Sequence, residues 1–180
     1  GAAGEAGRRL PAELGHRWLP KWFRAWRVLL LHCGGDSRRL PQYSLSGKLF
    51  TALPERTPWG DVSTVFDETM LLSLAWVRDM PPGLLVGSGD VVLTFDPACL
   101  DWSRPGVTGV GLRQPLDVAL QHGVYISDTE GRVYSFLQKP SETQVVAAGG
   151  VLEGGEAALD SGLLYFDAPV CERLMTIAGL

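Results

Sequence analysis

The sequence predicts a mixed α/β sheet flanked by helices. Short apolar runs alternate with helix-spaced apolar residues in the first half of the chain, and strand-like runs between glycine and proline turns dominate the second half. With 180 residues, 46% hydrophobic and 20% charged, the chain has the size and composition of one soluble domain. Its longest apolar runs are far shorter than the roughly 20 residues that a membrane span needs, so a membrane partner is not expected.

The chain begins with a predicted amphipathic helix, bent at Pro20. Its apolar side chains recur every four residues, namely Leu14, Trp18, Trp22 and Trp26. We interpret this tryptophan stripe as core packing rather than as a cofactor site. Residues 1–26 are therefore assigned to an N-terminal helical segment, and residues 27–180 to the main domain.

The apolar run 27–33 predicts a buried strand that ends at a Gly-Gly turn. Helical spacing from Phe66 to Val77 predicts a second helix, ended by the Pro-Pro-Gly sequence that follows. A glycine-rich mobile loop is expected over residues 147–156. The remaining predicted elements are strands at 84–86, 91–95, 107–112, 123–127, 133–137 and 163–166, and a last helix at 168–177.

Charge is distributed unevenly. Residues 1–60 contain ten Lys and Arg against four Asp and Glu, whereas the remaining 120 contain six against sixteen. A basic first third suits a small anionic ligand, while a nucleic-acid partner would favour a domain that is basic throughout. Three widely spaced cysteines, Cys33, Cys99 and Cys171, predict buried, reduced thiols of a cytoplasmic protein, and the N-terminus has no signal-peptide pattern.

The run that follows the first strand is typical of a phosphate-binding loop. Gly34 and Gly35 allow close backbone approach, and consecutive N–H groups near Ser37 can form an anion-binding nest. Arg38, Arg39 and, after Ser-Gly, Lys48 can add charge-assisted contacts to phosphate oxygens. The run matches neither a Walker loop nor a dinucleotide-binding fingerprint. A plain turn followed by a solvated basic loop is the alternative interpretation.

Four further residues are candidates for chemistry. Asp90 follows a predicted strand, where a carboxylate near phosphate is a natural Mg²⁺ ligand; alternatively it initiates a turn. Lys139, fixed by Pro140, can hold a second anion, although an exposed lysine before proline is common. His122 precedes a predicted strand and Asp160 begins a short polar turn; a lone histidine is more often structural than catalytic.

The motifs of other enzyme classes are missing from the sequence. No serine–histidine–acid order, HExxH, nucleophile elbow or Cys/His metal-ligand pairing occurs, so hydrolase and zinc interpretations have little support. A nucleotide loop, a carboxylate for Mg²⁺ and a distant lysine for another anion together fit nucleotidyl transfer.

These motifs and their order resemble the sugar nucleotidyltransferases. Within them, the chain looks most like the GDP-L-fucose pyrophosphorylase domain of bifunctional L-fucokinase/fucose-1-phosphate guanylyltransferases. The run Gly-Gly-x-Ser-x-Arg-Leu-Pro from Gly34, followed by Ser-Gly-Lys at Lys48, is the most specific part. The segments around Asp90, His122, Lys139 and Asp160 follow in the family's order. Gly1 to Gly7 does not match the glycine-rich segment that such enzymes carry before this strand.

The resemblance implies a Rossmann-like sheet of the GT-A type. It implies Arg39 and Lys48 as catalytic cations, with Gly34, Gly35, Ser37 and Arg38 around the phosphates of GTP. It further implies Asp90 as a ligand of Mg²⁺, with Lys139, His122 and Asp160 in contact with the sugar phosphate. A second metal carboxylate, a β-helix and a sugar-kinase domain would then be expected beyond Leu180, so the chain is interpreted as an incomplete nucleotidyltransferase domain.

Two functions are compatible with the sequence. The first is an enzyme of nucleotide-sugar biosynthesis that converts L-fucose 1-phosphate and GTP to GDP-L-fucose and pyrophosphate. The second is a non-catalytic or degenerate nucleotide-binding module attached to an L-fucokinase. The presence of Arg39, Lys48, Asp90 and Lys139 favours the enzyme, because a decayed site has no physical reason to keep all four.

Overall fold

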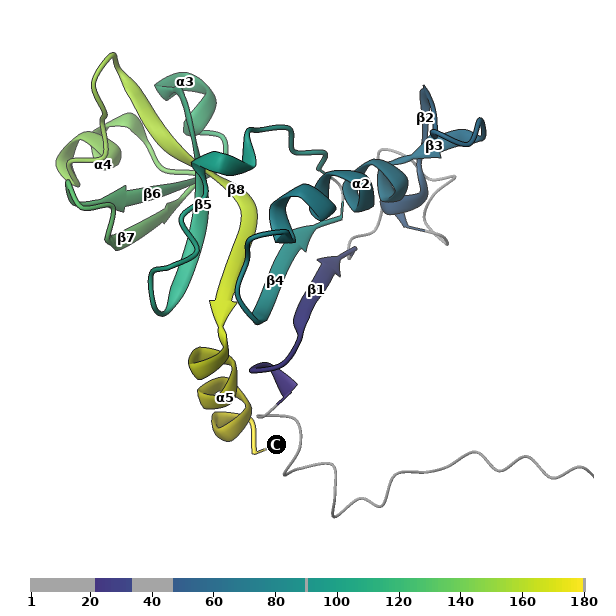
Figure 1. Cartoon of the computed structure of the whole chain (residues 1–180). Helices are drawn as coiled ribbons and strands as arrows, with labels where there is room; N and C mark the ends of the chain where they lie inside the picture. The colour runs from purple at the N-terminus through teal and green to yellow at the C-terminus, as the bar shows by residue number, and fades with distance from the viewer. Residues whose placement is uncertain (1–21, 34–46, 90, 180) are drawn as a thin grey trace, which may run out of the picture.

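The computed structural model describes residues 22–33, 47–89 and 91–179. Its centre is a mixed six-stranded sheet in the order β1-β4-β8-β6-β7, with β5 also paired to β8 (Figure 1). This confirms the predicted α/β class. The strands are β1 (Arg27–His32), β4 (Gly83–Ser88), β5 (Val107–Pro115), β6 (Gly123–Ser127), β7 (Val133–Gln138) and β8 (Glu156–Asp167).

Short elements surround this sheet. A separate hairpin of β2 (Ala52–Arg56) and β3 (Val62–Thr64) leads into α2. The helices are α2 (Val65–Val77), α3 (Leu116–Ala119), α4 (Glu142–Ala147) and α5 (Ala168–Ile177), with 3-10 turns η2 (Lys48–Phe50) and η3 (Pro97–Cys99). None of the helices in the described residues is long and apolar enough to cross a bilayer.

Helix α2 forms where its sequence predicts, but it buries a different face from the apolar spacing, since Leu74 is 63% exposed while Thr69 and Ser73 are buried. Thr64 and Asp67 form a capping box, in which the Asp67 N–H donates to the Thr64 hydroxyl and the Thr64 N–H donates to the Asp67 carboxylate. Trp76 on the opposite end of the helix is buried in a core cluster with Leu85 and Tyr165 of the sheet. The helix therefore covers one face of β1, β4 and β8.

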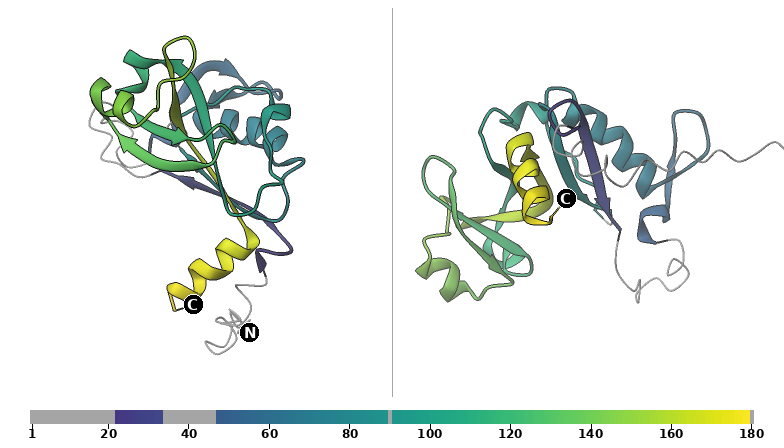
Figure 2. Two further views of the ribbon diagram at one scale, coloured as in Figure 1. Left: turned by 90° about the vertical axis from the view of Figure 1, so that its left-hand side faces the viewer. Right: turned by 90° about the horizontal axis from the view of Figure 1, so that it is seen from below.

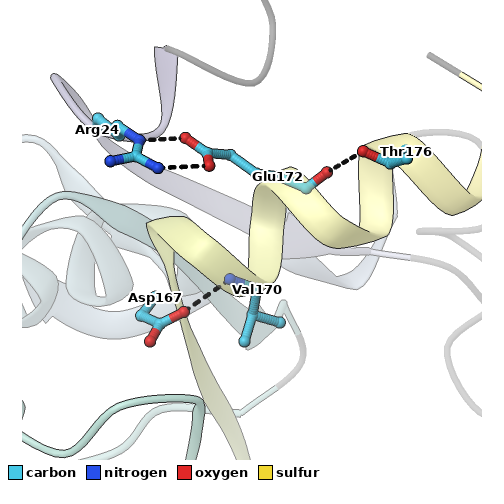
Figure 3. A network of polar contacts seen from close by, with 5 residues as sticks. All are labelled: Arg24, Asp167, Val170, Glu172 and Thr176. Atoms are coloured by element: carbon cyan, nitrogen blue, oxygen red, sulfur yellow. Dashed lines mark hydrogen bonds and ion pairs between the residues drawn. The ribbon is translucent and has the colours of Figure 1, made fainter.

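Helix α5 extends from the end of β8 rather than lying over a face of the sheet (Figures 1 and 2). The Asp167 carboxylate accepts the Val170 N–H at 2.8 Å and so caps the first turn. The Arg24 guanidinium donates twice to the Glu172 carboxylate, and the Thr176 hydroxyl donates to the Glu172 carbonyl (Figure 3). This fork-like pair ties the segment before β1 to α5.

The predicted strand at residues 91–95 is wrong. The segment is irregular, and the Phe95 ring instead stacks on Trp76 with centroids 5.1 Å apart. Leu93 and Phe95 both pack on the cluster around α2. Leu93 and Phe95 are therefore apolar because they pack against the buried cluster that contains Trp76, and not because they belong to a strand of the sheet.

Three expectations about burial are also wrong. Strand β1 forms, but it lies at an edge of the sheet, and Leu30 is 46% exposed. Cys33 and Cys99 are exposed, and of the three free thiols only Cys171 is buried. The Trp22 and Trp26 rings lie tilted against each other, and at 52% and 57% exposed these two are not core residues. The rest of the predicted N-terminal helix lies outside the described residues.

The second half of the sheet is more extensive than predicted. Strand β8 begins at Glu156 rather than at the predicted Leu163, and α4 forms in a segment where no helix is predicted. The glycine-rich run between them is a turn closed by the Leu152 N–H, which donates to the Glu156 carbonyl at 2.7 Å. The predicted elements at β4, β5, β6, β7, α2 and α5 are confirmed, with shifts of a few residues at some ends.

Candidate functional site

Strands β4 and β6 lie end to end along one edge of β8. Strand β5 pairs with both halves of β8, so the strands that pair with those same halves, β4 and β6, must lie on its other edge. The pairing with β4 ends at Leu164, and the pairing with β6 begins at Leu159. We call residues 160–163, with the adjoining ends of β4 and β6, the strand junction. In open α/β sheets, ligands bind beside the carboxyl ends of strands, and Ser88 at the carboxyl end of β4 lies at this junction.

Two glycines allow the neighbouring strands to approach β8 closely at the strand junction. A Cβ atom at Gly123 would lie 3.2 Å from the Cβ atom of Asp160, and one at Gly162 would lie 3.3 Å from that of Ser88. Gly162 has a φ of 75°, in the left-handed region that favours glycine. The start of β6 thus approaches Asp160, and the end of β4 approaches Gly162.

The carboxylate of Asp160 is held by two donors. Its Oδ1 atom accepts the Tyr125 hydroxyl at 2.6 Å and the Gly162 N–H at 2.9 Å. Burial, this hydrogen bond and the charge of Asp160, in that order, raise the pKa of Tyr125 well above its usual value. The tyrosine is therefore a neutral donor at physiological pH. Sequence reasoning missed Tyr125, although it is the single phenol in an apolar strand two residues after Gly123.

His122 and Lys139 meet at the same end of the β6–β7 hairpin. The strands are antiparallel, with Gly123 opposite Gln138, so the residue before β6 and the residue after β7 become neighbours. The Lys139 N–H donates to the His122 carbonyl at 2.8 Å, and both residues are exposed. The structure thus brings His122, Lys139 and Asp160, which are distant in sequence, to one end of the hairpin beside the strand junction.

Lys139 has a backbone conformation that side chains rarely adopt. Its φ is 46°, and it is the one non-glycine residue with positive φ in the described part of the chain. The following Pro140 is buried, which fixes the chain beyond it. Such strained residues occur preferentially at functional sites, where the surrounding structure compensates their cost.

The ends of β1 and β4 form the other side of the site. These strands are parallel, and the Gly89 N–H donates to the His32 carbonyl at 3.0 Å where both end. A Cβ atom at Gly47 would lie 3.9 Å from the Cys33 carbonyl oxygen, so residues 33 and 47 lie together at this end. The half-buried Lys48 follows directly and begins η2.

The remaining predicted site residues are Gly34, Gly35, Ser37, Arg38, Arg39 and Asp90, and they lie outside the described residues. Their roles stay predictions. Within residues 22–33, 47–89 and 91–179, no three His, Cys, Asp or Glu side chains are grouped so that they could hold a metal ion. A magnesium ion does not need such a group, because it takes one or two carboxylates and fills its other positions with phosphate oxygens and water.

Comparison with known sequences identifies the family. The sequence profile of the fucose pyrophosphorylase domain matches residues 21–179. The chain is 31% identical over 161 residues to the bifunctional fucokinase/GDP-fucose pyrophosphorylase of Arabidopsis thaliana, covering 80% of this chain and 15% of that protein.

Two animal proteins are similar as well. The chain is 31% identical over 134 residues to the fucose-1-phosphate guanylyltransferase of Mus musculus, which covers 67% of this chain and 22% of that protein. It is 29% identical over 174 residues to the Homo sapiens protein of the same name, covering 82% and 28%. The chain thus spans less than a third of the length of these relatives.

Proposed function

The chain belongs to the fucose pyrophosphorylase family, and from this premise we propose that it carries the nucleotidyltransferase centre of a cytoplasmic fucose-1-phosphate guanylyltransferase. The reaction joins L-fucose 1-phosphate to GTP and releases GDP-L-fucose and pyrophosphate. The observation that carries the proposal is the meeting of His122, Lys139 and Asp160 beside the strand junction. The names of the relatives supply the substrates, and the mixed sheet is compatible with a GT-A-like nucleotidyltransferase fold.

The proposed chemistry is an in-line substitution at phosphorus. An oxygen of the sugar phosphate forms a bond to the α-phosphorus of GTP, while the bond to the bridging β-phosphate oxygen breaks and pyrophosphate leaves with the electron pair. The protein makes no covalent bond, so its contribution is positioning and charge neutralisation.

Each candidate side chain has a defined role in this proposal. Lys139 neutralises the sugar phosphate, while Arg39 and Lys48 stabilise the charge that grows on the departing pyrophosphate. Asp160 accepts a hydrogen bond from a sugar hydroxyl, and His122 contributes to substrate contact. The segment beyond Lys48 is anchored by Leu49, which is 5% exposed, so the lysine projects from a fixed turn.

We propose Mg²⁺ as the cofactor, held by Asp90 and by phosphate oxygens of GTP. The donor chemistry is suitable, because Mg²⁺ prefers carboxylate and phosphate oxygens, and in the sequence Asp90 directly follows Gly89 at the end of β4. When bound, Mg²⁺ polarises and partly neutralises the phosphates to which it is coordinated. A covalently linked L-fucokinase domain is a further part of the proposal, since one relative has both activities in its name.

The decisive experiment is a pyrophosphate-release assay on the protein expressed from the full coding sequence that contains this chain. A panel of nucleoside triphosphates is combined with a panel of sugar 1-phosphates, with and without Mg²⁺. Turnover is expected with GTP and L-fucose 1-phosphate, and only in the presence of Mg²⁺. Nucleotide binding by calorimetry without any turnover would instead support the non-catalytic module, and turnover with another pair would reject the substrate assignment.

A further inference from the structure

Tyr125 is the one side chain that links β6 directly to the Asp160 carboxylate. It lies two residues after Gly123 on β6, opposite Ala158 of β8. From there its hydroxyl reaches along β8 to Asp160 Oδ1, a distance of 2.6 Å. The bond is short and charge-assisted, which makes it one of the stronger hydrogen bonds that a neutral donor can form.

Small residues leave room for the tyrosine ring. A Cβ atom at Gly109 would lie 2.9 Å from the Tyr125 hydroxyl, closer than real contacts allow, and one at Gly111 would lie 3.5 Å from the ring. On the other side the ring packs against Phe136, with centroids 5.4 Å apart. The ring is therefore held between β5 and β7, and its hydroxyl has a fixed direction.

The two bonds to Asp160 share one oxygen. Tyr125 and the Gly162 N–H both donate to Oδ1, and no residue in the described part of the chain donates to Oδ2. A carboxylate oxygen can accept two hydrogen bonds, so Tyr125 and Gly162 fill the accepting capacity of Oδ1 and do not use that of Oδ2. The tyrosine stays protonated at physiological pH because burial and the carboxylate raise its pKa. Its donor function is thus permanent.

We propose that Tyr125 is a positioning residue that fixes the Asp160 carboxylate so that Oδ2 accepts a hydroxyl of the sugar 1-phosphate. The inference rests on the proposed function, which assigns Asp160 to the sugar. Tyr125 acts through Asp160 and contacts no substrate. Its removal therefore weakens sugar 1-phosphate binding and leaves GTP binding as it was.

The test is Tyr125→Phe, which removes the hydroxyl and keeps the ring. L-fucose 1-phosphate and GTP are titrated separately by calorimetry, so the readout does not require turnover. The dissociation constant for L-fucose 1-phosphate should rise about 10-fold, while that for GTP stays constant. Tyr134→Phe is the matched control, because Tyr134 is 63% exposed on β7 and donates to the Ala148 carbonyl instead.

A double-mutant cycle with Asp160→Ala separates positioning from general damage to the fold. If Tyr125 acts through Asp160, Tyr125→Phe causes no further loss of L-fucose 1-phosphate binding in the Asp160→Ala background. An equal loss in both backgrounds would overturn the inference, as would equal weakening of GTP binding. Wild-type protein that binds no sugar 1-phosphate overturns the proposed function as well, whereas normal binding by Tyr125→Phe overturns this inference alone.

Discussion

The two halves of β8 belong to different cores. Its C-terminal half contributes Leu163 and Tyr165 to an aromatic cluster with Trp76 and Trp102, and the Trp102 and Tyr165 rings meet edge to face at 5.3 Å. Its N-terminal half contributes Ala157 and Leu159 to a cluster of small aliphatic side chains, the others being Ala119, Val124, Ile126 and Val145. Aromatic ring contacts thus stabilise the side of the sheet near β4, and aliphatic packing stabilises the side near β6.

The strand junction lies between these two cores. The Ser161 hydroxyl is buried there and donates to the Val110 carbonyl at 2.6 Å, while it accepts the Leu163 N–H at 3.2 Å. Its polar atoms are satisfied within the chain, as burial requires. The difference between the flanks teaches that the two sides of the site can be altered separately. They are the β1–β4 side, proposed above to bind the nucleotide, and the β6–β7 side, proposed above to bind the sugar phosphate.

The largest expected effect is on stability of the aromatic core. Leu85→Ala should lower the free energy of unfolding by about 2–5 kcal/mol, since a fully buried leucine leaves a cavity among rigid rings. Val145→Ala, fully buried in the aliphatic cluster, should have a smaller effect because it removes fewer carbon atoms. Urea unfolding measures both. Equal losses would show that the two cores respond alike.

The second largest expected effect comes from removing a positive charge on the side proposed to bind the nucleotide. Lys48→Ala should lower turnover at least about 100-fold, the scale lost when one preorganised donor to a transition state is removed. The melting temperature should be nearly unchanged, because Leu49 and the Phe50–Phe66 ring contact still fix η2. The matched control is Arg56→Ala, an exposed cation on β2 that donates to the Gly60 carbonyl. Wild-type turnover in Lys48→Ala would reject the role of this lysine.

The third effect tests the sugar side. Lys139→Ala should raise the KM for L-fucose 1-phosphate by roughly 10- to 150-fold, and far less that for GTP, because one hydrogen bond to a charged group is lost. Lys139→Arg should recover only part, since it restores the charge and not the position. Arg132→Ala at the other end of the hairpin, where Arg132 pairs with Asp128, is the control. Equal weakening for both substrates would contradict the division of the site.

Local patterns predicted the elements whose sequence is unambiguous. Helix α5 begins and ends as expected, because Asp167 before a proline at the first turn is a strong start signal. The first half of β8 was missed, since alanines at 157 and 158 between acidic residues have little strand propensity by themselves. They form a strand because β5 and β6 pair on both sides of them, and that information is not local.

The candidate site shows the same limit. The sequence singled out His122, Lys139 and Asp160 one by one, and the order of motifs suggested a shared task. Their proximity depends on antiparallel pairing of β6 with β7 and on the register of β6 against β8. Tyr125 was missed because its partner lies 35 residues away on another strand. Long-range hydrogen bonds of this kind follow from topology rather than from spacing.

The smallest effect concerns the backbone of Lys139. Lys139→Gly and Lys139→Ala both remove the ammonium group, so they should raise the KM for L-fucose 1-phosphate equally. Their stabilities should differ, because a φ of 46° is unfavourable for alanine and permitted for glycine. Relief of that strain, about 1–2 kcal/mol, exceeds the entropy that glycine adds to the unfolded chain, about 0.5–1 kcal/mol. The free energy of unfolding, measured with urea, should therefore be about 0.5 kcal/mol higher for the glycine variant than for the alanine variant. A glycine variant less stable than the alanine variant would show that the positive φ at residue 139 carries no free-energy penalty.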